Sequence, residues 1–300
     1  MDSVPYRFID QLCYLTSNEI FGIESPRWKF VSATYEDRRR FHLFLKPEKN
    51  GNLRYSFVTV IQGRNYEVNT HCFGLEDVAA MNVRHFWLLG VCVKNAIPGD
   101  SGGFEISFHE FQNRLLPFAR RRLFHQGMNY LTLLSADQAL QASILSIYQQ
   151  LYHFKKLTLV YSSKQTMKFL RDQTANNTRL RTVALEGKWP QSLVPLLFKL
   201  VARKNVACNV AETEIDLSFA FIGDLIENFR SNGGRCKVIA HCALSSEDLK
   251  TLFTLANMQK IKETAVLSEY TLQRSKREIL IVKFEGTLLT VASYKTNGEV

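Results

Sequence analysis

One apolar spacing recurs along the second half of the sequence at a fixed interval. Each copy has three such positions, the second three residues and the third five residues after the first. Self-similarity at an interval of roughly 20–50 residues is typical of proteins built from repeated supersecondary units. The three clearest copies are Met128-x-x-Leu131-x-Leu133, Phe154-x-x-Leu157-x-Leu159 and Leu180-x-x-Val183-x-Leu185, whose first positions are equally spaced.

Three later copies are weaker or displaced. The fourth, Val206-x-x-Asn209-x-Ala211, keeps the interval but has a polar residue at its second position. A three-residue insertion around residues 231–234 then moves the frame to Arg235-x-x-Val238-x-Ala240. The last copy, Ile261-x-x-Thr264-x-Val266, follows one full interval later. We expect each copy to be a strand that begins one repeat unit.

Helix-start signals follow most of these predicted strands. A Ser or Thr with Gln or Asp three residues later is typical of a capped helix N-terminus, and Pro favours the first helical turn. A strand that always returns through a helix pairs in parallel with the preceding strand. The signals are Ser135/Gln138, Ser162/Gln165, Trp189-Pro190, Thr213/Asp216 and Ser245/Asp248.

Two architectures fit such a series: a curved solenoid with its helices on one side, or a doubly wound sheet with helices on both faces. The short, equal spacing favours the first. We therefore predict an α/β protein whose residues 126–270 form a leucine-rich-repeat-like strand–helix solenoid with a parallel sheet. The asparagine ladder of leucine-rich repeats is missing, since the matching positions hold Ala136, Ser162 and Lys188. The repeat is a divergent relative or a look-alike of that class.

The regions that flank the repeats have a different pattern. Residues 25–125 read as a smaller α+β region with antiparallel strands, punctuated by turn signals such as Asn50-Gly51. Residues 271–300 read as a terminal β-hairpin that caps the repeats. The predicted strands before the repeats are 41–45, 53–61, 66–68, 86–93 and 104–108, followed by a helix at 115–123.

Composition bounds the class of protein. The net charge of +10 and the pI near 9.3 make a basic nucleic-acid-binding protein an alternative interpretation. No apolar run reaches the roughly 18–20 residues that span a bilayer, so we expect no membrane segment. The six cysteines are dispersed and form no C-x-x-C pair. We therefore expect reduced thiols in a cytoplasmic or nuclear protein.

Two stretches imitate catalytic or metal-binding motifs. Residues 99–103, Gly-Asp-Ser-Gly-Gly, copy the nucleophile loop of chymotrypsin-like proteases, but His71 lies too close before Ser101 for the barrel and linker of that fold. Cys236, His241 and Cys242 lack the paired spacing of a zinc site. We predict a protein that is not an enzyme and that needs no cofactor or metal.

Two further patches carry a family resemblance. They are residues 1–8, Met-Asp-Ser-Val-Pro-x-x-Phe, and the Leu180–Pro190 segment with Asn176-Asn177 before it. Together they resemble the expanded nematode F-box-associated proteins. In that family an amino-terminal F-box binds a Skp-type adaptor of a cullin ubiquitin ligase, and the carboxyl-terminal region holds substrates.

The resemblance implies a partner-binding helix at the start of the chain. An F-box has three helices, whereas residues 1–24 here match only the first, so we describe them as a degenerate F-box-like helix. The expected function is a non-catalytic protein-interaction module that resembles a substrate-recognition subunit, with an adaptor and a substrate protein as partners. The apolar positions that match the F-box are Val4, Pro5, Phe8, Ile9, Leu12 and Leu15.

Overall fold

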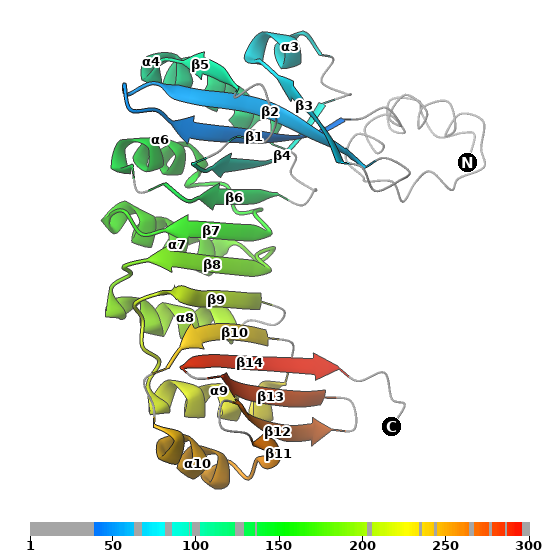
Figure 1. Cartoon of the computed structure of the whole chain (residues 1–300), viewed down its shortest axis with the longest axis vertical. Helices are drawn as coiled ribbons and strands as arrows, with labels where there is room; N and C mark the ends of the chain where they lie inside the picture. The colour runs from blue at the N-terminus through cyan, green and yellow to red at the C-terminus, as the bar shows by residue number, and fades with distance from the viewer. Residues whose placement is uncertain are drawn as a thin grey trace, which may run out of the picture. The chain divides into compact units, whose positions relative to one another are not determined.

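The computed structural model shows a mixed α/β protein (Figure 1). The chain divides between Lys155 and Lys156 into two compact units. The structure describes residues 39–62, 68–81, 86–95, 97, 103–123, 129–135, 137–202, 206–233, 236–242, 245–263, 267–275, 278–285 and 287–295. No helix in these ranges is long and apolar enough to cross a membrane.

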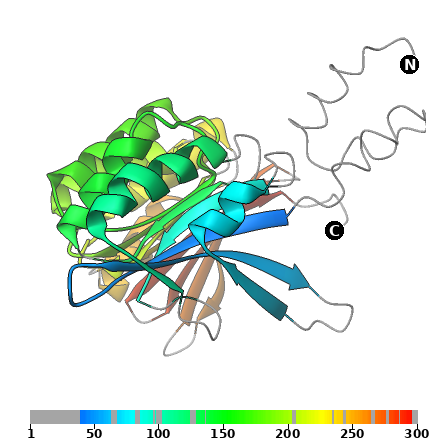
Figure 2. The same cartoon turned by 90° about the horizontal axis from the view of Figure 1, so that it is seen from above.

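The first unit has a sheet with strand order β3-β2-β1-β4-β6, and β5 pairs with β2 beside β3. Its helical segments include α5 and α6, which contact each other and lie on one face of this sheet (Figure 2). The strands are β1 (Arg39–Pro47), β2 (Leu53–Gln62), β3 (Val68–Phe73), β4 (Phe86–Val93), β5 (Phe104–Ile106) and β6 (Tyr130–Leu133). The helical segments are α3 (Leu75–Ala80), α4 (Phe108–Glu110), the π-helical η2 (Phe111–Leu115), α5 (Leu116–Arg122) and α6 (Gln138–Tyr148).

Aromatic packing forms the core of the first unit. Phe41 stacks on Phe86 with ring centroids 4.5 Å apart, and Phe118 of α5 meets Phe57 and Phe86 edge-on. Successive side chains of a strand point to opposite faces of the sheet. The face of β1, β2 and β4 that carries these phenylalanines is therefore directed at the helices. The predicted antiparallel strands at 41–45 and 53–61 are present as β1 and β2, which pair with each other.

The prediction of an antiparallel region is correct in part. β1, β2, β3 and β5 pair antiparallel, but β4 pairs parallel with β1 and with β6. β1 therefore has one antiparallel and one parallel neighbour. Periodicity alone gives no partner for a strand, because the pairing of β1 with β4 joins segments that lie far apart in the sequence.

The second unit begins with four parallel strands in sequential order, β7-β8-β9-β10. Consecutive helices of this unit contact one another and lie on one face of the strands (Figure 1). The parallel pairing of these consecutive strands agrees with the expected parallel sheet. The elements are β7 (Lys156–Val160), α7 (Lys164–Asn176), β8 (Thr182–Gly187), η3 (Gln191–Leu193), α8 (Val194–Val201), β9 (Val206–Thr213), α9 (Phe219–Asn232), β10 (Cys236–His241) and α10 (Ser246–Leu255).

Four antiparallel strands continue the sheet of the second unit in the order β14-β13-β12-β11, with β14 paired to β10. The expected hairpin of β13 and β14 is present, but it belongs to this larger sheet. The prediction that residues 261–266 begin a sixth repeat strand is wrong, because Ile261 lies in the antiparallel edge strand β11. The strands are β11 (Gln259–Glu263), β12 (Leu267–Ser275), β13 (Glu278–Glu285) and β14 (Leu288–Lys295).

The repeat frames mark the buried face of the parallel strands. Leu157 and Leu159 of β7 pair with Val183 and Leu185 of β8, and all four are buried. The frame predicted for β9 is displaced by one residue. Its buried residues are Val206, Cys208 and Val210, whereas Asn209 is exposed. Val183 pairs with Cys208 rather than with Asn209, so the interval between β8 and β9 is one residue shorter than the one before it.

The helix N-termini differ from most of the predicted caps. Ser245 and Asp248 form the expected reciprocal capping box of α10. The N-cap of α6 is Asp137, whose side chain accepts from the Leu140 N–H, and the N-cap of α9 is Ser218. Ser163 rather than Ser162 precedes α7. Neighbouring polar residues compete for each cap, so sequence alone places the helix start to within a few residues.

Candidate interaction surface

The residues expected to bind a partner at the start of the chain, Val4 to Leu15, lie outside the described residues. Residues 99–102 of the protease-like loop, which include Ser101, are also outside them. His71 is described and is exposed on β3. The structure therefore leaves the expected adaptor-binding helix as a prediction from sequence.

The histidine and cysteine at the end of β10 are held by separate contacts. The Cys242 thiol is buried and donates to the Leu217 carbonyl at 3.4 Å. His241 Nδ1 bonds to the Thr287 hydroxyl at 3.1 Å. Across the described part of the chain, no group of three or more His, Cys, Asp or Glu side chains could hold a metal ion.

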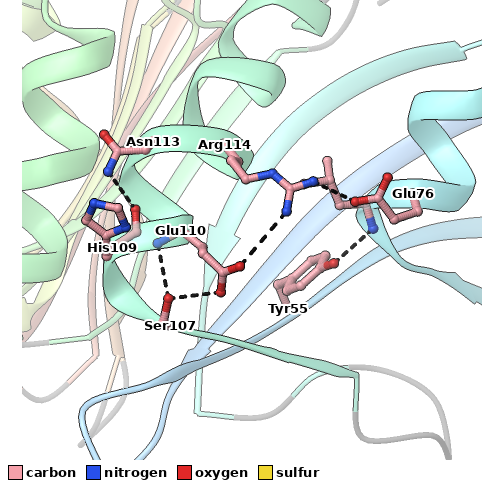
Figure 3. A network of polar contacts seen from close by, with 8 residues as sticks. Tyr55, Glu76, Ser107, His109, Glu110, Asn113 and Arg114 are labelled. Carbon is pink, nitrogen blue, oxygen red and sulfur yellow. Dashed lines mark hydrogen bonds and ion pairs between the residues drawn. The ribbon is translucent and has the colours of Figure 1, made fainter.

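A polar network in the first unit joins α3 to the π-helical segment (Figure 3). The Arg114 guanidinium lies 2.7 Å from the Glu76 carboxylate and 3.9 Å from that of Glu110. Ser107 caps α4 by accepting from the Glu110 N–H, and its hydroxyl donates to the Glu110 carboxylate. The Tyr55 hydroxyl accepts from the buried Leu75 N–H at 2.9 Å.

This network connects α3 to η2 and has a structural role. π-Helical turns often occur at functional sites, and η2 directs Arg114 toward α3. However, two carboxylates already accompany the guanidinium, which leaves little positive charge for an anionic ligand. The ion pairs are also exposed, and such pairs contribute about 0–1 kcal/mol.

A second polar contact crosses the sheet of the first unit. His42 of β1 and Tyr130 of β6 both pair in register with Gly90 of β4, which lies between them. The two rings stack at 5.4 Å, and His42 Nδ1 bonds to the Tyr130 hydroxyl. Burial lowers the pKa of His42, and burial, with Cys92 nearby, raises the pKa of Tyr130. Both groups are therefore neutral near pH 7.

Apolar side chains gather on the sheet of the second unit, on the face opposite its helices. We call this face the open face. Ile279 pairs with Tyr294 and Ile281 with Ala292 across β13 and β14, while Ile239 projects from β10 two residues after Lys237. The Tyr294 side chain is 51% exposed, and the isoleucines are half-buried. We name the cluster of Ile239, Ile279, Ile281 and Tyr294 the open-face patch.

Charged and polar side chains border the open-face patch. Lys237 is exposed and pairs in register with Ala292. Lys283 lies 3.2 Å from the Glu269 carboxylate of β12. An apolar centre containing a tyrosine within a polar border is the usual anatomy of a protein-binding surface.

Sequence reasoning did not identify the open-face patch. The segment Ile279–Phe284 predicts a strand, and its apolar residues occupy both faces. Leu280, Val282 and Phe284 are buried beneath the helices, so Ile279 and Ile281 must point the other way. The sequence feature that could have indicated the patch is this apolar run, in which apolar residues do not alternate with polar ones.

Comparison of the chain with protein-family models, with curated proteins and with solved structures finds no match in any of the three.

Proposed function

We propose that this protein is a non-catalytic protein-interaction module whose partner binds the open face of the second unit. The observation that carries the proposal is the open-face patch, which puts the exposed Tyr294 beside Ile279 on paired strands. Tyrosine anchors of this kind supply much of the affinity at protein interfaces because they bury a large area with few rotatable bonds.

The parallel strands beside the patch support the same function. β7 to β10 pair in sequential order with helices on one side, and we interpret this series as a strand–helix solenoid. Such stacks offer a wide, rigid surface, and rigidity lowers the entropy cost of binding. By its resemblance to F-box-associated proteins, the module is a substrate-recognition subunit of a cullin-type ubiquitin ligase, with a Skp-type adaptor at residues 1–24.

Affinity capture with quantitative mass spectrometry tests the surface. Ile281→Ser combined with Tyr294→Ser removes two anchors from the open-face patch. Leu255→Ser is the matched control, because Leu255 is 72% exposed on α10, away from the patch. We expect the specific partners to be lost from the patch variant and kept by the control. An identical partner set for both variants, each shown to be folded by circular dichroism, would reject the surface.

The ligase role has a separate test. The purified chain is mixed with a Skp-type adaptor at micromolar concentration, with Phe8→Ala/Leu12→Ala as the comparison. We expect association that this variant weakens. A folded chain that does not associate with the adaptor removes the ligase role and leaves the interaction function standing.

A further inference from the structure

A row of side chains leads away from the open-face patch across the parallel strands. Lys156 of β7 pairs with Thr182, Thr182 with Ala207, and Ala207 with Lys237 of β10. These residues alternate with the buried Leu157, Val183, Cys208 and Val238, so they project from the open face. Three strand steps of about 4.8 Å put the two lysines roughly 14 Å apart.

The two lysines at the ends of this row are available for a ligand. Both are exposed, and neither forms an ion pair with a carboxylate in the described part of the chain. Elsewhere in the same unit, Lys188 lies 2.9 Å from Glu214 and Lys283 lies 3.2 Å from Glu269. The row is therefore positively charged and lacks internal neutralisation.

Helix dipoles do not account for these charges. The helix C-termini of parallel βα units lie near the amino ends of the strands, where nearby cations are favoured. Lys156 and Lys237 project from the opposite face of the sheet, away from α7 and α9. Thr182 and Ala207 lie between them and have short side chains, so a polypeptide can approach the sheet closely there.

The row joins the open-face patch at Lys237. Its register continues through Ala292 to Ile281, and Tyr294 lies two residues beyond Ala292 on β14. A ligand that follows the row therefore meets two cations and then an apolar anchor.

Charge and shape select among three occupants. A second copy related by a two-fold axis through the patch would bring Lys237 near its own symmetry mate, which is repulsive. Single-stranded nucleic acid binds on a series of aromatic side chains. Among the Phe, Tyr and Trp residues of the described strands, Tyr294 is the one on the open face, and His241 of β10 lies on that face away from the row. An acidic protein segment meets neither objection.

We propose that the open face binds an acidic segment of a partner protein, which lies across β7 to β10 with carboxylates at Lys156 and Lys237 and an apolar side chain at Tyr294 and Ile281. This inference rests on the proposed function and specifies its partner. The binding free energy then combines apolar burial with two charge contacts that salt weakens.

Fluorescence anisotropy on the full chain provides the test. The first probe is a labelled oligo-glutamate peptide with a central Leu-Phe pair, and the second is an oligo-uridine RNA of similar charge. We expect K156E/K237E to weaken peptide binding by about tenfold or more. The matched control is K164E/K168E, which makes the same charge change at exposed positions of α7. It should leave the affinity within about twofold.

Four outcomes overturn the inference. Equal weakening by both charge reversals would show a general effect of net charge. Tighter binding of the RNA, with dependence on Lys156 and Lys237, would assign the row to nucleic acid. Captured partners that need Tyr294 and Ile281 but not the lysines would reject the acidic segment and keep the proposed function. Partners that need neither set would reject both.

Discussion

The Tyr130 hydroxyl reaches Nδ1 of His42 across Gly90, a residue that has no side chain to separate the two rings. A Cβ atom at Gly90 would lie 2.6 Å from the Tyr130 carbonyl oxygen and 2.7 Å from its ring. Atoms do not pack at those distances, so the glycine is a condition of the contact. Both the steric role of Gly90 and the titration of His42 can be tested.

Gly90→Ala should destabilise the protein by about 1–3 kcal/mol, because Tyr130 or its backbone must move. Urea-induced unfolding followed by circular dichroism measures the change. Gly223→Ala is the control. A Cβ there meets Leu252 at an ordinary 3.7 Å in the middle of α9, so alanine should stabilise by about 0.5–1 kcal/mol. Equal effects of the two changes would contradict the steric account.

Acid should destabilise the native state through His42. Its pKa is lowered by burial from an ordinary value of 6.5, so the unfolded chain binds the proton first as the pH falls. Stability is then lost from about pH 6.5 downward until the folded-state pKa is passed. His42→Gln keeps an acceptor for Tyr130 but does not titrate. The free energy of unfolding of wild type should fall relative to this variant below that pH, and parallel pH profiles would exclude the effect.

Two buried tyrosines should respond in opposite ways to loss of the hydroxyl. The Tyr148 hydroxyl is fully buried and has no hydrogen-bond partner among the described residues, so Tyr148→Phe should be neutral or stabilise by about 1–3 kcal/mol. Tyr55→Phe should cost about 1–3 kcal/mol, because it leaves the Leu75 N–H without its acceptor. Chemical denaturation of both variants gives the comparison. A larger loss for Tyr148→Phe would reverse the interpretation.

The helix caps of the second unit give another matched pair. Ser245→Ala should cost about 0.5–2 kcal/mol, because Ser245 accepts from the Asp248 N–H at 3.1 Å in a capping box. Ser163→Ala should have little effect, since Ser163 forms no side-chain cap bond at the start of α7. Thermal unfolding of each variant would show the difference, and similar losses would indicate that the serines act through something other than capping.

Features that depend on neighbouring residues in the sequence were predicted correctly, whereas features that depend on distant segments were not. Periodicity predicted the buried residues Leu157, Leu159, Val183 and Leu185, because the spacing of apolar residues along a strand indicates which of its faces is buried. The frame at Val206 was displaced because the return from α8 is one residue shorter, and no local signal reports that length. The parallel partner of β1 and the antiparallel role of Ile261 depend on segments far away in sequence.

The candidate surface depends even more on tertiary pairing. Lys156, Lys237 and the hairpin that carries Ile281 and Tyr294 are widely separated in the sequence, and each residue has an ordinary strand context. Only the order in which β7 to β10, β14 and β13 pair brings them to one face. The expected partner-binding residues at the start of the chain were local by comparison, which is why a sequence resemblance could single them out.

The position of β14 has a consequence for how the protein is made. This strand lies between β10 and β13, although it follows both in the chain. During synthesis, β11, β12 and β13 emerge first, and no strand pairing joins them to the parallel strands until β14 arrives. One edge of β10 in the nascent second unit therefore remains unpaired until β14 is made. A chain stalled on the ribosome before residue 288 should be a protease-sensitive intermediate whose antiparallel strands do not yet pair with β10.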